Sequence, residues 1–546
     1  MFFSDPLSQN FNDARKQQGE PDEIVLSVVE PPAKAKIERR KMIADENIVD
    51  PLDYFFNVEL EDTLPWFDAD DCVNQVVEDC FKESFIPRDE DQTNIAVKDS
   101  SIGLPSAELF SSSSPQSSNP YHGTSILLGY ALQDTKQPIG FTQTVSAQNL
   151  SVKEPVLYDG EGHLLTLGST GSGKGVSCII PTLLSYTGPV VVVDPKGEAA
   201  KLTAGYRRDI LGQRVLIVDP WRLVAEQTHA LNPLDAVDMN QPGYFEAAQA
   251  LASLIIATDS GEQRVDPHWN MRARQIVTSL LMLLARHFPS HLRNLEMLSR
   301  IFSMPPADFA KLMVAADRSP VAEISRLPGQ VLMAADKERS SIFSSALRGL
   351  GVWSSSFLLP AIDRSDVKLD EIIDGAPLTI YFVIPPQNLK THGGLLSVWI
   401  GTILNAILKR TPGQNLPKTL LILDEAAQLG YLPQVPLLYN LARGFGVRVW
   451  TIWQSPAQLK ITYPDDYENL VDQCHVLQSF GITNSRMAHQ IAHLVGGVTP
   501  EEILDMPSDQ SLVLAQSFSD RKPRFLTKPN YLTNKLLWAR SGLSLG

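Results

Sequence analysis

The sequence predicts an α/β protein, in which a parallel sheet is covered by helices and an all-helical segment is inserted into the chain between its strands. Three observations support this prediction. Short apolar, β-branched runs alternate with helical stretches from Gly123 onward. One of these runs leads into a glycine-rich loop that a helix follows. Between about Asn232 and Asp366, helical periodicity continues without a convincing strand.

The predicted strands are short and uniformly apolar, which is typical of strands that are buried on both faces of a parallel sheet. Each ends near a glycine, an aspartate or another turn-forming residue. They are expected at residues 163–168, 189–194, 214–219, 377–384, 419–424, 447–453 and 474–480.

The strand-free segment contains several predicted helices. In "DPHWNMRARQIVTSLLMLLARHF" apolar residues recur at steps of three and four, and similar patterns follow in residues 291–304, 306–317 and 321–353. The segment also has a local excess of arginines, which either engage phosphates or form the solvated faces of helices. These arginines are Arg272, Arg274, Arg286, Arg293 and Arg300.

The acidic charge of the 546-residue chain is concentrated at its start. Residues 1–100 hold 24 acidic and 10 basic side chains, whereas the remainder holds 38 and 37. A nearly neutral body excludes a globally basic nucleic-acid binder but leaves room for a local basic channel. We expect residues 1–120 to be an acidic, partly disordered N-terminal arm that recognises a partner, with a solvated flexible leader as the alternative.

Cysteine content and hydropathy bear on the compartment. Four cysteines are too few for a disulfide scaffold in a chain of this length. No window approaches the 18 apolar residues that a membrane span needs, and no export signal is visible at the start. These observations predict a cytoplasmic protein.

The stretch "GSTGSGKGVS" is nearly a phosphate-binding loop of the pattern G-x-x-x-x-G-K-[ST]. Lys174 is expected to reach the β- and γ-phosphates of a nucleotide. Gly175 stands where a hydroxyl normally meets Mg²⁺. The candidate nucleotide-binding residues are Gly168, Ser169, Thr170, Gly171, Ser172, Gly173, Lys174, Gly175 and Val176.

Polar side chains at the ends of two later strands are candidates for the hydrolytic chemistry. Asp424 is predicted to hold Mg²⁺, and Glu425 to orient and deprotonate the attacking water. Gln454 is expected to sense the γ-phosphate, although Gln454 and Ser455 alternatively cap the next helix.

The stretch "VVVVDPKGE" ends a further strand close to where the loop must lie. Its polar residues are Asp194, Lys196 and Glu198. A functional role and a simple turn remain equally open for them.

At these residues the chain resembles the type IV coupling proteins, the ring ATPases of bacterial conjugation and type IV secretion. The resemblance covers about residues 123–530 and lies in the order of the motifs. They are "GEGHLLTLGSTGSGKGVS", "VVVVDPKGEAAKLTAGYRR", "ALNPLD", "ERSSIFSSALRGL", "LLILDEAAQLG" and "WQSPAQLKITY".

The resemblance implies a RecA-like P-loop nucleotide-binding domain with an inserted all-alpha domain, and a homohexamer around a central channel. It implies hydrolysis of ATP with Mg²⁺, and delivery of DNA, protein or both to a secretion channel with inner-membrane type IV secretion components as partners. Several members of the family carry glycine after the loop lysine. The resemblance therefore implies that Gly175 is compatible with hydrolysis, with water replacing the missing hydroxyl.

Family members usually begin with two membrane-spanning helices, and this sequence has the acidic arm in their place. We therefore expect a variant without the anchor, which partners recruit to the cytoplasmic face of the inner membrane.

Ring ATPases commonly complete the site with an arginine from the neighbouring subunit. Arg443 is the first candidate, and Arg348 and Arg448 compete with it.

The resulting hypothesis is a coupling ATPase that recruits its substrate and uses ATP hydrolysis to deliver it. The alternative is a nucleotide-gated receptor or adaptor of the same machinery without sustained turnover. A DNA translocase for chromosome or phage packaging would share the motor but not the order of motifs.

The chain is predicted to divide into the arm (1–120), two parts of the nucleotide-binding domain (121–232 and 367–530), the all-alpha domain (233–366) and a C-terminal tail (531–546).

Overall fold

The computed structural model describes residues 74, 76–78, 81, 123–132, 154–256, 267–332, 334–441 and 444–542. Nearly all of the predicted N-terminal arm therefore lies outside the described residues. No helix in the described part of the chain combines the length and the apolar character needed to cross a bilayer.

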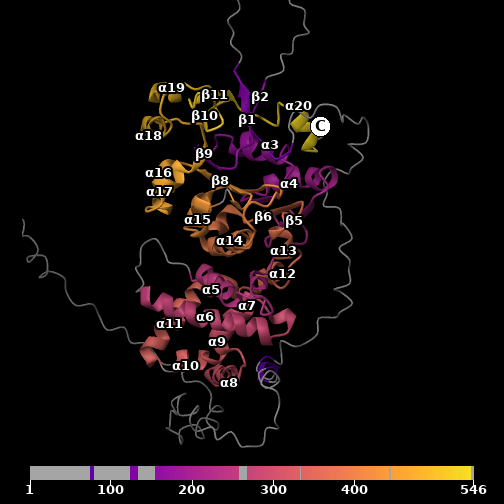
Figure 1. The fold of residues 1–546 in the computed structure, drawn as a ribbon, viewed down its shortest axis with the longest axis vertical. Coiled ribbons are helices and arrows are strands. Elements are labelled where there is room, and N and C mark those ends of the chain that lie inside the picture. The colour runs from indigo at the N-terminus through magenta and orange to yellow at the C-terminus, as the bar shows by residue number, and fades with distance from the viewer. Residues whose placement is uncertain are drawn as a thin grey trace, which may run out of the picture. The chain divides into compact units, whose positions relative to one another are not determined.

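One large sheet organises the described residues (Figure 1). Its strand order is β2-β1-β11-β10-β9-β3-β8-β7-β4-β6-β5. The stretch from β9 to β5 is parallel, as predicted, and the remaining strands pair antiparallel. The parallel strands are β3 (His163–Gly168), β4 (Val190–Val193), β5 (Arg214–Val218), β6 (Leu378–Phe382), β7 (Thr419–Leu423), β8 (Val447–Trp453) and β9 (Cys474–Phe480).

The antiparallel strands extend one side of the sheet and were not predicted. Each is short, and β2 and β11 are only partly buried, so their sequences lack the uniformly apolar signal of the central strands. They are β1 (Ile126–Ala131), β2 (Pro155–Tyr158), β10 (Gln510–Ala515) and β11 (Arg524–Thr527).

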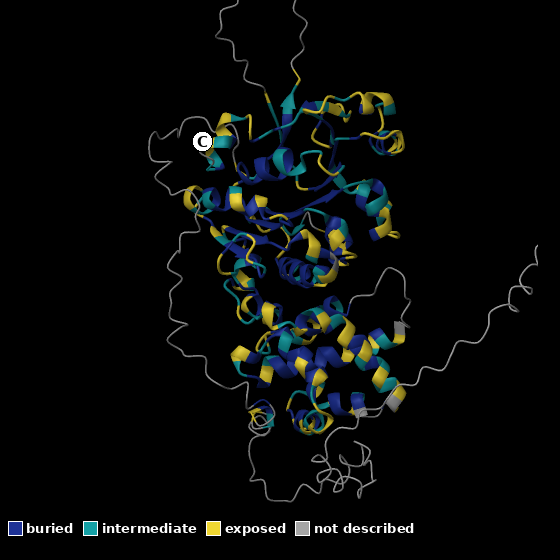
Figure 2. Cartoon of the chain, turned by 180° about the vertical axis from the view of Figure 1, so that it is seen from behind, coloured by how far each residue is buried: buried dark blue, intermediate teal, exposed yellow. Residues whose placement is uncertain are grey.

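Burial is greatest along the central strands (Figure 2). Every residue of β3, β4, β6, β7 and β8 is buried, because helices cover both faces of the parallel part of the sheet. The helices and turns that connect or follow the strands are η4 (Gly175–Ile179), α3 (Ile180–Leu183), α4 (Glu198–Gly205), η5 (Tyr206–Ile210), α14 (Pro386–Ile407), η10 (Ala426–Leu429), α15 (Gln434–Leu441), α16 (Pro456–Thr462), α17 (Tyr467–Asp472), α18 (Ser485–Val495), α19 (Pro500–Leu504) and α20 (Lys535–Arg540).

The described residues of the segment between β5 and β6 contain helices and turns but no strand, as predicted, and α5–α11 gather into one bundle (Figure 1). Its elements are η6 (Pro233–Ala236), α5 (Tyr244–Ile255), α6 (Pro267–His287), η7 (Ser290–Leu292), α7 (Leu295–Ser303), α8 (Pro306–Asp317), α9 (Ala322–Ser325), α10 (Leu327–Leu332), α11 (Asp336–Leu350), η8 (Gly351–Ser354), η9 (Ser356–Leu358), α12 (Leu359–Ile362) and α13 (Leu369–Ile373).

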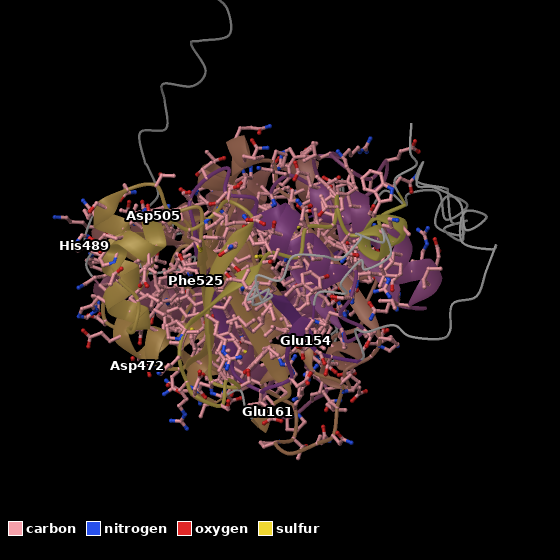
Figure 3. The ribbon with its side chains drawn as sticks, turned by 90° about the horizontal axis from the view of Figure 1, so that it is seen from above. Glu154, Glu161, Asp472, His489, Asp505 and Phe525 are labelled. Atoms are coloured by element: carbon pink, nitrogen blue, oxygen red, sulfur yellow. The ribbon has the colours of Figure 1, made fainter. Side chains whose placement is uncertain are left out.

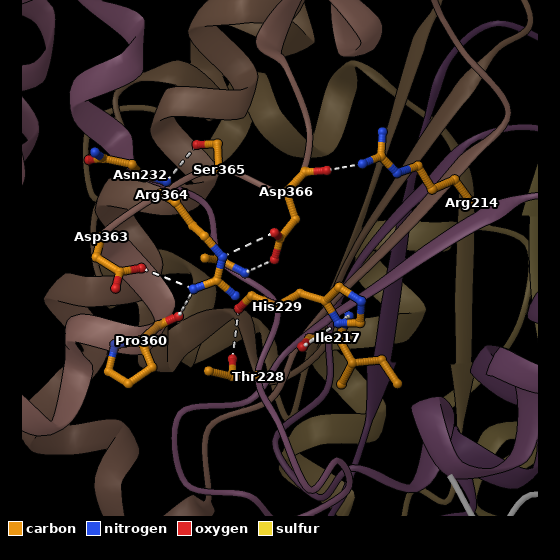
Figure 4. Close-up of polar contacts among 11 residues, drawn as sticks. Arg214, Ile217, Thr228, His229, Asn232, Pro360, Asp363, Arg364, Ser365 and Asp366 are labelled. Atoms are coloured by element: carbon orange, nitrogen blue, oxygen red, sulfur yellow. Dashed lines mark hydrogen bonds and ion pairs between the residues drawn. The ribbon is translucent and has the colours of Figure 1, made fainter. Parts of the chain in front are cut away.

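The chain enters and leaves this helical segment through a hydrogen-bonded neck (Figure 4). The amide of Asp366 donates to the Ala230 carbonyl at 2.9 Å, and the Asp366 carboxylate accepts from the Ala230 amide at 2.7 Å. The amide of Asn232 donates to Ser365 Oγ at 2.9 Å. Arg364 Nε donates to Asp366 Oδ1 at 3.2 Å. Two stretches of chain that are about 130 residues apart are thereby fixed side by side.

Trp399 of α14 joins the sheet, the neck and the helical segment. Its ring stacks on Phe382 of β6 at 5.4 Å and meets Trp353 of η8 edge-on at 6.3 Å. Its Nε1–H donates to the Leu231 carbonyl at 2.9 Å. The side chain is fully buried, so its packing and its hydrogen bond both contribute to the stability of this junction.

Replacing Trp399 by alanine should lower the free energy of unfolding by about 3–5 kcal/mol, because it leaves a cavity among buried aromatic rings. Trp399→Phe keeps an aromatic ring but cannot donate to the Leu231 carbonyl, and should cost about 1–3 kcal/mol. Urea denaturation followed by circular dichroism measures both changes. The partly exposed Trp538 of α20 provides the control. Equal losses for Trp399→Ala and Trp538→Ala would contradict the role of Trp399.

Candidate functional site

The glycine-rich loop connects the end of β3 to the π-helical turn η4. Gly171 and Gly173 have φ angles of +77° and +87°, a region that side chains disfavour. Lys174 Nζ bends back across the loop and donates to the carbonyls of Gly168 at 3.0 Å and Ser169 at 3.3 Å. The predicted nucleotide-binding residues therefore form a compact loop with a lysine folded over it.

Two later segments hold this loop in place. Ser169 Oγ donates to the carbonyl of Gly481, which directly follows β9. Gly481 has φ +67°, and a Cβ there would lie 2.3 Å from the Cβ of Ser172, so only glycine fits. Lys528, which directly follows β11, donates from Nζ to the Ser172 carbonyl at 3.3 Å.

Asp424 and Glu425 follow the last residue of β7, as predicted. The pKa of Asp424 is raised to about 6, first by burial and then by the charge of Glu425, against the opposing charges of Lys174 and Lys196. Asp424 Oδ1 accepts from the Glu425 amide at 3.0 Å. Glu425 itself has φ +53° and ψ +45°, a left-handed conformation that costs a non-glycine residue about 1–3 kcal/mol.

Gln454 follows β8, the strand that lies between β3 and β7. Its Nε2 donates to Glu425 Oε2 at 2.9 Å, so the two predicted side chains meet. Ser455 caps α16 by accepting from the Gln458 amide. The capping alternative therefore holds for Ser455, whereas the Gln454 side chain contacts the predicted base.

The turn interpretation holds for Asp194, and a functional role for the segment stays a prediction. Asp194 is buried and accepts from the Ala200 amide at 2.8 Å, which fixes the turn before α4. Its pKa is raised to about 7, chiefly by burial and further by Asp424 and Glu198. Glu198 is exposed, and its Oε2 lies 3.9 Å from where a Cβ on Gly175 would stand. Glu198 thus lies next to the residue that lacks the hydroxyl.

The three candidate arginines have different outcomes. Arg443 lies outside the described residues. Arg448 is buried in β8 and donates to the carbonyls of Thr124 and, at 3.0 Å, Asp159. An arginine that is held in this way cannot reach a neighbouring subunit. Arg348 of α11 is exposed.

At least four of the five arginines in the helical segment contact the protein itself, and among them Arg293 donates to the Phe288 carbonyl and Arg300 is ion-paired with Glu296. Arg272 donates to the Gln330 carbonyl at 3.3 Å, and Arg274 donates to the Ile256 carbonyl at 3.0 Å. These contacts tie helices together, which favours the structural interpretation of both residues over phosphate binding.

An open groove of about 830 Å³ lies between α16, α17 and α18 and shares no residue with the predicted site. Asp472 and His489 are among the residues that line it (Figure 3).

The acidic residues suit a metal that a nucleotide helps to hold. Within the described ranges, no three His, Cys, Asp or Glu side chains are grouped as a metal site made by protein alone would require. Mg²⁺ in nucleotide sites usually takes one or two carboxylates and completes its shell with phosphates and water. Asp424 is a half-buried carboxylate whose ionisation Lys174 of the phosphate-binding loop favours, and its raised pKa indicates that a further nearby cation would stabilise its charged form.

Sequence reasoning missed Lys528. The stretch "RFLTKPN" contains no motif, and only the pairing of β10 with β11 brings this lysine to the loop. Residues 531–542, considered a tail from the sequence, include α20, and Tyr531 and Leu537 there are buried.

The sequence matches the family model described as type IV secretory system conjugative DNA transfer over residues 130–501. A conjugal transfer protein TraG of Escherichia coli is 25% identical over 363 residues, which are 63% of this chain and 56% of that protein. The coupling protein VirD4 of the Bartonella henselae type IV secretion system is 24% identical over 348 residues, 63% of this chain and 54% of that protein. The chain thus spans just over half the length of these relatives.

The fold is similar to that of the plasmid coupling protein TrwB in its structure with ADP and Mg²⁺. The TM-score is 0.52 at 18% identity, and the match covers 67% of this chain and 85% of that one. This likeness establishes the RecA-like P-loop architecture of the fold.

The raised pKa of Asp194 predicts a pH-dependent stability of the nucleotide-free protein. Between the ordinary pKa of 3.8 and about 7, folded Asp194 keeps a proton that the unfolded chain has lost. Stability from this group is therefore present at low pH and is lost as the pH rises to about 7. Between pH 5 and pH 8 the free energy of unfolding of Asp194→Asn should rise by roughly 2–3 kcal/mol relative to that of the wild type, because each pKa unit corresponds to about 1.4 kcal/mol.

Denaturation of both proteins across this pH range, without nucleotide or Mg²⁺, measures the difference. Asp505→Asn serves as the control, because Asp505 is exposed at the end of α19 (Figure 3). A constant difference between Asp194→Asn and the wild type would show that Asp194 ionises normally in the folded protein.

Proposed function

We propose a specific activity for this chain, which belongs to the type IV secretory system conjugative DNA transfer family. It is a coupling ATPase that binds ATP and Mg²⁺, recruits DNA, protein or both, and uses hydrolysis to deliver the substrate to a secretion channel. The chain matches just over half the length of its relatives, so the activity of those whole proteins is not simply transferred to it. The geometry of the site supports the proposal instead.

The observation that carries this proposal is the meeting of predicted groups at one edge of the sheet. Strands β3, β8 and β7 are neighbours and run parallel, so their carboxyl ends open to the same side. Lys174 follows the first strand within six residues, Gln454 follows the second, and Asp424 and Glu425 follow the third. The hydrogen bond from Gln454 to Glu425 links two of these ends.

Each group has a distinct role in the proposed reaction. The loop amides and Lys174 bind the phosphates, with Lys174 leaving the carbonyls of Gly168 and Ser169 for the nucleotide. Glu425 accepts the proton of the attacking water. Gln454 holds the Glu425 carboxylate by one oxygen and leaves the other free to accept. The left-handed backbone of Glu425 keeps the side chain in this place.

Asp424 would hold Mg²⁺, and Glu198 is an acidic group next to the place where the loop lacks its hydroxyl. Bound Mg²⁺ would neutralise charge on the phosphate oxygens during transfer. The site does not require a hydroxyl at residue 175, because water commonly completes the shell of this ion.

The assembly, location and domain boundaries complete the proposal. We place a homohexamer at the cytoplasmic face of the inner membrane, in contact with type IV secretion components. Arg443 of a neighbouring subunit would complete the site. We assign residues 233–366 to the all-alpha domain, and the neck that joins Asn232 to Ser365 supports this proposal. It separates the two parts of the nucleotide-binding domain, residues 121–232 and 367–530.

Glu425→Gln should lower steady-state ATP hydrolysis by about 10²–10⁴-fold, because a neutral amide cannot accept the proton of water. Nucleotide binding should persist, since the phosphate-binding residues are unchanged. Phosphate release measures the first quantity, and equilibrium binding of a fluorescent ATP analogue measures the second. Lys174→Ala is the companion variant and should lose binding as well as hydrolysis.

The assay includes a protein concentration series, with and without single-stranded DNA. Turnover that rises steeply with concentration and responds to DNA supports a ring motor. If the wild type binds nucleotide without turnover, and substrate transfer in cells survives Glu425→Gln, the chain is a nucleotide-gated receptor instead.

A further inference from the structure

The segment after β11 packs against the outside of the phosphate-binding loop and the helix that follows it. The amide of Tyr531 donates to the Val176 carbonyl at 3.4 Å, and Arg540 donates to the Leu184 carbonyl at 2.8 Å. Tyr531 is buried in a cluster with Ile180, and Val176 packs against that cluster. This segment lies beyond the residues that the family model matches.

Lys528 is the residue of this segment that contacts the loop itself. Its ammonium is half-buried, donates to the Ser172 carbonyl at 3.3 Å and lies 4.9 Å from the ring centre of Phe480. Within the described residues, no carboxylate lies close enough to form an ion pair with it. The amide of Lys528 is fixed by the Asp509 carbonyl at 2.7 Å, so the strand pair β10–β11 sets the position of the residue.

Burial lowers the pKa of Lys528, because partial loss of water disfavours its charged ammonium. Burial raises the pKa of the Cys178 thiol, and the charges of Lys528 and Lys174 oppose this rise, Lys528 more strongly. Two lysines from distant parts of the chain therefore lie near the same short loop.

The contact with the Ser172 carbonyl has a consequence for the other side of the same peptide unit. In a trans peptide the carbonyl and the following N–H point in opposite directions, and the described chain has no cis peptide bonds. An ammonium that holds the Ser172 carbonyl therefore turns the N–H of Gly173 away from itself. Phosphate binding by such a loop needs its N–H groups, and not its carbonyls, to face the nucleotide.

The peptide needs such a restraint because its conformational freedom is high. Gly173 has φ +87° and no side chain, and an ideal Cβ there would meet nothing closer than Ser177 Oγ at 3.7 Å. Glycine populates both hands of φ readily, so the Ser172–Gly173 peptide can rotate unless an outside contact fixes it. Among the described groups, Lys528 supplies the charged contact to the Ser172 carbonyl.

We propose that Lys528 is a positioning residue of the nucleotide site, whose ammonium holds the Ser172 carbonyl outward so that the Gly173 amide faces the phosphates. The segment from Lys528 to Tyr531 thereby sets the nucleotide affinity of the loop through its contacts with loop carbonyls. This inference rests on the proposed function, because it assumes that the loop binds a nucleotide.

The test compares ADP binding by the full chain carrying Lys528→Met with the wild type. Methionine is of similar length and apolar, so it fills the space without holding the carbonyl. We expect ADP affinity to fall about tenfold, which corresponds to about 1.4 kcal/mol, while the thermal midpoint stays close to that of the wild type. Lys528→Arg keeps a cationic donor and should restore most of the affinity. Lys522→Met is the matched control, because Lys522 is exposed six residues earlier.

Isothermal titration with ADP and thermal denaturation distinguish the outcomes. Loss of affinity in Lys528→Met with rescue by Lys528→Arg supports the inference. Wild-type affinity in Lys528→Met overturns it and leaves the proposed function standing, provided that Lys174→Ala fails to bind. Equal losses in both Lys528 variants with lowered midpoints also overturn it, since the role is then structural. If Lys528→Met does not fold, Lys528→Leu, which also lacks a donor for the Ser172 carbonyl, is held to the same outcomes. A wild type that binds no ADP removes the proposed function itself.

Discussion

The hydrogen bonding of β8 between β3 and β7 is the constraint on which the site depends. Leu167 of β3 is paired with Trp453 of β8, and Leu423 of β7 is paired with Thr451. This parallel register brings three strand ends to one edge, so that residues almost 300 positions apart in the sequence share one site. A slip of one residue in β8 would turn its buried side chains to the opposite face, and the buried core on both sides opposes such a slip.

The helical insertion is compatible with this sheet because its two ends are fixed together. The neck around Asp366 joins the chain that leaves β5 to the chain that approaches β6, and those strands are themselves neighbours. Close packing then ties the insertion to α14. A Cβ at Gly401 would lie 2.4 Å from Leu254 of α5, so the two helices approach at a glycine. The sheet therefore accommodates over a hundred extra residues without a change in its strand order.

The C-terminal strands β9, β10 and β11 give the loop a support in addition to the strand that leads into it. Strand β9 delivers Gly481 to one side of the loop, and the β10–β11 pair delivers Lys528. One contact uses a loop hydroxyl and the other a loop carbonyl, so neither occupies a loop amide. A flexible glycine-rich loop thus acquires a defined shape from groups that belong to the C-terminal part of the chain.

The sequence by itself determined the parallel strands, the helical insertion and the positions of Lys174, Asp424 and Glu425, because each is encoded by local periodicity or by a motif at a strand end. Tertiary structure decided what no local pattern carries. It paired Gln454 with Glu425, buried Arg448 against Tyr158, added the antiparallel strands and brought Lys528 to the loop. These contacts depend on the pairing of strands that are hundreds of residues apart in the sequence. The apolar pattern of a short or half-exposed strand is too weak to predict which strand it pairs with.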